Sequence, residues 1–106
     1  METFQKIIDQ LIREMDEMTF HHAIYEARER IGLRLYRAAE LSGMPMGRLK
    51  RLETGMYRSL PHDEELEGLH KLYGLPLETM REKAAEHVKI MRNRTKMEKF
   101  CGIGQV

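Results

Sequence analysis

Apolar side chains recur along this chain at intervals of three and four residues, which places them on one face of an α-helix. A first helix is predicted at residues 2–18, with an apolar stripe formed by Phe4, Ile8, Leu11, Met15 and Met18. Further helices are expected at residues 20–31, 34–42, 46–54 and 62–73, and a last one from after Pro76 to about Lys99. Because no segment alternates apolar and polar residues, strands are not expected. The pattern predicts an all-α fold.

Glycines mark the ends of the predicted helices. Gly32, Gly43, Gly55 and Gly74 each follow directly on one, where glycine adopts a left-handed conformation at little cost. Residues 56–61 are expected to form a loop.

The length of 106 residues suits one compact domain. We expect a central domain at residues 20–85, an amphipathic helix before it at residues 1–19, and a basic helical extension with a frayed tail at residues 86–106. The first helix either packs on this domain or forms a dimer seam. Its two heptads are short for an independent coiled coil.

The net charge of +1 conceals an alternation of charge along the chain. Residues 31–58 hold six basic and two acidic residues, a net charge of +4, and residues 87–106 hold five basic residues and one acidic residue, again +4. Residues 1–30 carry −3, from four basic and seven acidic residues, and residues 59–86 carry −4, from three and seven. We therefore expect a basic surface at residues 31–58 on an acidic body.

The centre of the chain has the residue types that two short helices joined by a tight turn require. Ala39 is small, which lets the helices cross closely, and Gly43 permits the positive φ that reverses the chain. Met44 fills the angle between the helices, while Leu49 and Leu52 anchor the second helix to the core. The outward positions of the second helix are then Met46, Gly47, Arg48, Lys50 and Arg51.

Around residues 22–80 the chain resembles the helix-turn-helix regulators of the Cro and phage-repressor type, the XRE family. The matching positions are Arg28, Gly32-Leu33, Ala39, Gly43, Glu53-Thr54-Gly55 and Tyr73-Gly74. The resemblance implies a lambda-repressor-like helix-turn-helix domain of about five helices, extended by a helix at each end. It also implies a sequence-specific DNA-binding transcriptional regulator, of prokaryotic, phage or plasmid type, and a largely buried ion pair between Arg28 and Glu53.

The chain departs from the family pattern at the start of both central helices. Arg34 and Leu35 stand where the family has a Ser or Thr cap followed by Gln, and Pro45 replaces another Ser or Thr cap. Met46 and Gly47 occupy the positions that most often read bases, although neither side chain can hydrogen-bond to a base edge.

The contacts expected with double-stranded DNA follow from these departures. Polar base contacts are predicted from Arg51, Lys50 or Arg48, because arginine pairs well with guanine. Met46 could touch a thymine methyl group, and Gly47 lets the backbone approach closely. Phosphate contacts are predicted from Arg34, Thr54, Tyr57 and Arg58.

A homodimeric repressor on a palindromic site is expected, because one such module makes few base contacts. The dimer candidates are Phe4, Ile8, Leu11, Met15 and Met18 in the first helix, and Met80, Val88 and Met91 in the last. A second hypothesis is an antitoxin or protein-interaction adaptor, in which the terminal helices hold a toxin or another regulator. The basic C-terminal block is either a solvated helix end, a second DNA contact or a contact with an acidic partner.

Other classes of function find little support in the sequence. Cys101 is the only cysteine, which excludes an internal disulfide and suits a reducing cytoplasm. No histidine has a metal-ligand spacing, and no phosphate-binding loop or nucleophile elbow is present. We therefore expect no metal, no other cofactor and no enzymatic activity. No transmembrane helix or signal peptide is expected.

Overall fold

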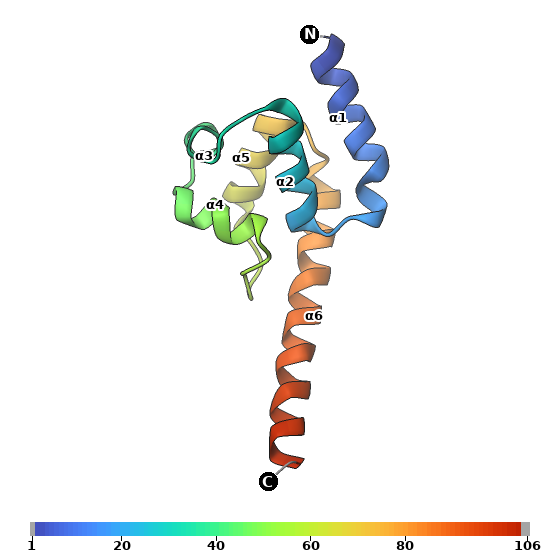
Figure 1. Ribbon diagram of the computed structural model, residues 1–106, viewed down its shortest axis with the longest axis vertical. Helices are drawn as coiled ribbons and strands as arrows, with labels where there is room; N and C mark the ends of the chain where they lie inside the picture. Colours follow the sequence, from blue (N-terminus) through green and yellow to red (C-terminus); the bar gives the residue numbers. More distant parts are fainter. Residues whose placement is uncertain (1, 105–106) are drawn as a thin grey trace.

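The computed structural model describes the backbone of residues 2–104 and the side chains of residues 4–94. Within this part of the chain the structure is all-helical, with six α-helices, one 3₁₀ turn and no strands, as predicted (Figure 1). The elements are α1 (Glu2–Glu14), η1 (Met15–Glu17), α2 (Phe20–Ile31), α3 (Leu35–Ser42), α4 (Met46–Glu53), α5 (Asp63–Tyr73) and α6 (Leu77–Gly104).

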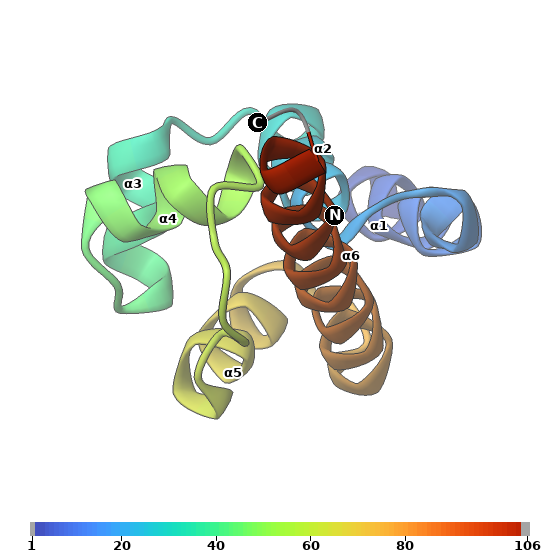
Figure 2. The same cartoon turned by 90° about the horizontal axis from the view of Figure 1, so that it is seen from below.

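The helices are arranged around α2 and the first half of α6. The α3–α4 pair and α1 lie on opposite sides of α2, and α5 packs beneath α3 (Figures 1 and 2). The second half of α6 projects beyond the other helices (Figure 1), and the molecule extends 59 Å along its longest axis and 28 and 21 Å along the others.

The apolar stripe of the first helix faces the interior of the chain. Ile8, Leu11 and Met15 are at most 1% exposed, and Met80 and Val88 are at most 4% exposed. Burying these side chains removes apolar surface from water within one chain, so they are not available as a dimer seam. Among the other candidates, Phe4 is exposed, and Met18 and Met91 are half-buried. Of the two interpretations of the first helix, packing on its own domain is the one supported.

The turn between α3 and α4 spans Gly43–Pro45. Gly43 has φ 76°, and its N–H and that of Met44 bond to the last carbonyls of α3. Met44 is buried, as expected for the residue that fills the angle between the two helices.

A close approach of α3 and α5 depends on Gly68. A Cβ atom on Gly68 would lie 2.2 Å from the carbonyl oxygen of Ser42, far inside van der Waals contact. Only glycine at this position lets α5 reach the end of α3 and so support the turn.

Candidate nucleic-acid interface

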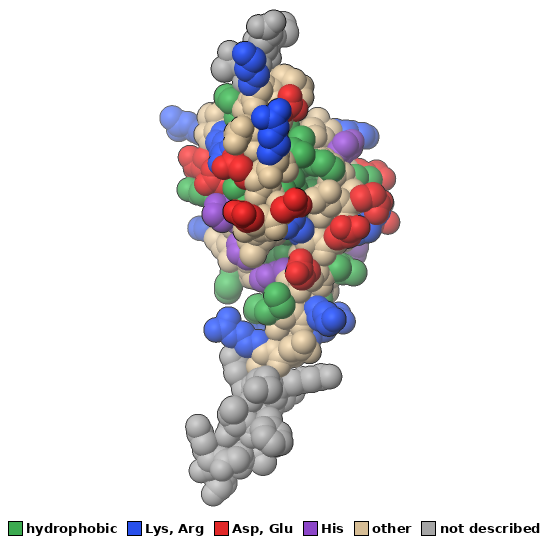
Figure 3. All heavy atoms as spheres, turned by 90° about the vertical axis from the view of Figure 1, so that its right-hand side faces the viewer, with side chains coloured by type: hydrophobic (Ala, Val, Ile, Leu, Met, Phe, Trp, Pro, Cys, Tyr) green, Lys and Arg blue, Asp and Glu red, His purple; other side chains and the backbone are tan. Residues whose placement is uncertain are grey.

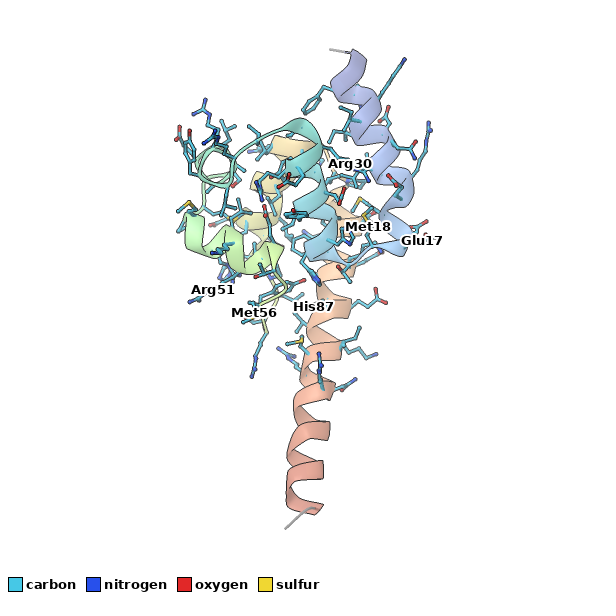
Figure 4. All side chains as sticks on the ribbon, viewed as in Figure 1. Glu17, Met18, Arg30, Arg51, Met56 and His87 are labelled. Carbon is cyan, nitrogen blue, oxygen red and sulfur yellow. The ribbon has the colours of Figure 1, made fainter. Side chains whose placement is uncertain are left out.

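One face of α4 is held by the core and the opposite face is open to solvent. Leu49 and Leu52 are completely buried. The open face carries Met46, Gly47, Lys50, Arg51 and Thr54, all exposed. Arg51 points away from the body of the molecule (Figure 4). The hydroxyl of Thr54 donates to the Lys50 carbonyl oxygen, 2.9 Å away, so a phosphate would have to compete for that hydrogen bond.

The predicted ion pair between Arg28 and Glu53 is present. Nε of Arg28 donates to both carboxylate oxygens, at 2.8 and 3.1 Å, and Nη2 donates to Oε1 at 3.0 Å. The two side chains are only 12% and 5% exposed. Hydrogen bonding to Glu53 raises the pKa of Arg28, and Nη1 also donates to the carbonyl of Leu33. The pair fixes the end of α4 to α2.

Arg48, which the sequence predicts as a base contact, is bound to Glu65 instead. Its Nε donates to Oε2 of Glu65 at 2.7 Å, and Nη2 donates to Oε1 at 3.0 Å. Oε1 of Glu65 also accepts from the backbone N–H of His62, so the carboxylate is held at the start of α5. The hydrogen bond from Arg48 lowers the pKa of Glu65. Arg48 therefore fastens α4 to α5, and its charge is already satisfied within the chain.

Tyr57, which the sequence predicts as a phosphate contact, is buried instead. Its side chain is 2% exposed, and burial raises the pKa of its hydroxyl. Its ring lies 4.4 Å from the ring of His87 and 5.9 Å from that of Phe20, measured between centroids. The Tyr57 ring thus packs the loop after α4 against α2 and α6 instead of contacting DNA.

The pair of histidines His21 and His87 completes this contact. The rings of His21 and His87 lie 5.0 Å apart, and Nε2 of His87 donates to the carbonyl oxygen of Gly55, 3.1 Å away. His87 on α6 faces the loop that contains Met56 (Figure 4). The ring of His21 lies directly against Gly55. The only signal for His87 in the sequence is its position three residues after Ala84 of the apolar stripe, which is weak.

Five of the eleven arginines in the described part of the chain form ion pairs with carboxylates of other residues. The pairs are Arg28 with Glu53, Arg30 with Glu14 and Glu26, Arg37 with Glu40, Arg48 with Glu65, and Arg81 with Glu78 and Asp63. Among the same described side chains, no acidic partner is found for the exposed cations Arg34, Lys50, Arg51 and Arg58. The basic residues at and around α4 therefore divide into cations that hold the fold together and cations free to bind an anion.

Among the described side chains, no three His, Cys, Asp or Glu residues converge as metal ligands would. Cys101 lies outside the described side chains. No described helix is long and apolar enough to cross a membrane.

Comparison of the chain with protein-family models, with curated proteins and with solved structures finds no significant match.

Proposed function

We propose that this chain is a sequence-specific DNA-binding transcriptional regulator with a lambda-repressor-like helix-turn-helix, in which α3 and α4 are the two helices of the motif. The observation that carries the proposal is the open face of α4, where Lys50 and Arg51 are exposed without acidic partners, while the neighbouring Arg28 and Arg48 are paired with Glu53 and Glu65. A helix presented in this way fits the major groove of B-DNA.

The roles of the individual side chains follow from their placement. Arg51 and Lys50 lie on the outer face of α4 and reach base edges or flanking phosphates. Arg34, at the start of α3, and Arg58, in the loop after α4, contact the phosphate backbone on either side. Met46 is 52% exposed and is positioned for apolar contact with a thymine methyl group.

The chain acts as a dimer in this proposal, because a single α4 reads too short a sequence. With Ile8, Leu11 and Met15 buried, the contact surface is formed by exposed positions. The strongest remaining candidates are Phe4 and the shallow groove lined by Lys6, Ile7, Gln10 and Arg30.

The test is selection of bound duplexes from a random library, followed by titration of the selected duplex at several salt concentrations. A recurring palindromic sequence, with an affinity that falls steeply between low and moderate salt, is the expected result. Failure to shift any duplex at low salt would refute the proposal.

One observation favours a second function, an antitoxin or protein-interaction adaptor with the same fold. The first turn of α4 presents Met46 and Gly47, which offer no side-chain hydrogen bond to a base. In this case a protein partner would bind over Met46. Met46→Gln, which adds no charge, would then weaken capture of that partner while leaving the salt-dependent binding of DNA phosphates unchanged.

A further inference from the structure

The helix α6 is fixed against the end of α4 at His87. Nε2 of His87 donates to the Gly55 carbonyl oxygen at 3.1 Å, and the buried ring of Tyr57 lies against the imidazole. The direction in which α6 leaves the body is thereby set relative to α4. At 1.5 Å per residue, Lys89 and Arg92 follow His87 by about 3 and 7.5 Å along the helix axis.

The turns of α6 just beyond His87 are basic and contain no acidic residue. Residues 87–94 include Lys89, Arg92 and Arg94 and no Asp or Glu, and residues 54–62 likewise contain Arg58 and no acidic residue. Lys89 and Arg92 are exposed, and no acidic partner is found for them among the described side chains. In Figure 3, Lys and Arg side chains are the charged groups farthest along the described part of α6, while Asp and Glu lie nearer the body.

The basic turns of α6 adjoin the loop that follows α4. Leu60 of this loop lines one shallow groove together with Val88, Lys89 and Arg92 of α6. Arg58 is exposed two residues before Leu60. Unpartnered cations are therefore present on α4, on the loop that follows it and on the turns of α6 that adjoin this loop.

We propose that Lys89 and Arg92 of α6, together with Arg58, bind the phosphate backbone of the DNA whose major groove is occupied by α4. This inference rests on the proposed function and adds a second contacting element to it. A duplex seated on α4 continues past the C-terminal end of that helix, where Arg58 and the basic turns of α6 are held by the contacts of His87. Unpaired cations in such a place gain free energy by displacing counterions from phosphates.

The experiment compares the double variant Lys89→Gln/Arg92→Gln with the matched control Arg13→Gln/Lys71→Gln. The control removes one exposed arginine from α1, on the opposite side of α2 from α4 (Figure 1), and one exposed lysine from the last turn of α5. Binding of a fluorescent duplex is titrated from 50 to 300 mM salt, and the slope of log K against log salt concentration is measured. Circular dichroism checks that both variants retain the helical content and melting temperature of the parent.

The expected result is a slope smaller in magnitude by about 1.8 for each bound protomer of Lys89→Gln/Arg92→Gln, or about 3.6 for a dimer, because each protomer loses two phosphate contacts. The control is expected to keep the parental slope. An unchanged slope in the α6 variant, or an equal decrease in both variants, overturns the inference and makes these turns a solvated helix end or a surface for an acidic protein. These results leave the proposed function intact, because Lys50→Gln/Arg51→Gln would still reduce binding. If the parent protein shifts no duplex at low salt, both proposals fail together.

Discussion

The guanidinium of Arg28 and the carboxylate of Glu53 share three hydrogen bonds of 2.8–3.1 Å, which tie the last turn of α2 to the last residue of α4. Because both side chains are nearly buried, neither charge can be hydrated if its partner is removed. The orientation of α4 on the rest of the domain therefore depends on this pair as well as on Leu49 and Leu52.

Glu53→Ala is expected to reduce the free energy of unfolding by about 3–5 kcal/mol, because it strands the Arg28 charge in a buried place. Urea unfolding followed by circular dichroism measures the change. The control is Arg37→Ala, which breaks an exposed pair with Glu40 and should cost less than about 1 kcal/mol. Similar losses in the two variants would show that the Arg28–Glu53 pair is as well hydrated as a surface pair.

Arg51→Ala is expected to weaken binding to the selected duplex by about 1–3 kcal/mol if Arg51 contacts a base. Its exposed position leaves the melting temperature unchanged. An equal loss on a scrambled duplex would assign Arg51 to a phosphate instead.

Arg48→Gln should show the opposite behaviour to Arg51→Ala. Its two hydrogen bonds to Glu65 link α4 to α5, so its loss should lower the melting temperature. At temperatures where Arg48→Gln is fully folded, its affinity for DNA should equal that of the parent protein. A strong loss of affinity in the folded variant would return Arg48 to the DNA-contacting set.

Gly68→Ala is expected to destabilise the fold by about 1–3 kcal/mol, because the new methyl group would overlap the Ser42 carbonyl and force α3 and α5 apart. The matched control is Gly47→Ala in α4, where an added Cβ meets nothing within 4 Å. That change should stabilise the helix by about 0.5–1 kcal/mol, since alanine is the better helix former. Thermal melts of the two variants should therefore move in opposite directions.

The stability of the fold is expected to fall as the pH drops below 6.5, partly because of His21. Burial, followed by the nearby His87 and His22, lowers the pKa of His21 below its ordinary 6.5. The unfolded chain therefore takes up this proton at a higher pH than the folded chain. The contribution of His21 to stability is complete above pH 6.5 and is lost as the pH falls through the lowered pKa of the folded state. Urea unfolding between pH 7.5 and 5 should show a weaker pH dependence in His21→Gln, and an unchanged dependence would exclude His21 as a source.

Leu11→Glu tests whether the apolar face of α1 packs within its own chain or joins two copies in a dimer. Because Leu11 is fully buried, a charge there should unfold the chain rather than release folded monomers. Phe4→Glu, at a position 44% exposed, should leave the chain folded. Sedimentation then reports whether the Phe4 surface holds two copies together; a folded, monomeric Leu11→Glu protein would restore α1 as the seam.

The elements of the fold could be predicted because their causes are local. The spacing of apolar residues identified the helices, and Gly32, Gly43 and Gly74 end α2, α3 and α5 with φ of 76–80°. The Arg28–Glu53 pair was also anticipated, but only through resemblance to a known family. Neither periodicity nor charge could have matched two residues that are 25 positions apart.

The amino-acid sequence by itself determined which residues share a face of each helix, where most helices end, and that the positive charge concentrates at residues 31–58 and 87–106. Only the tertiary structure decided which face is covered and by what. In the folded chain, Leu11 and Met15 are buried, Tyr57 lies against His87, and Arg48 forms an ion pair with Glu65. The physical reason is that periodicity and charge are properties of a single segment. Burial and pairing are set by the distances between segments, which exist only once the helices have packed.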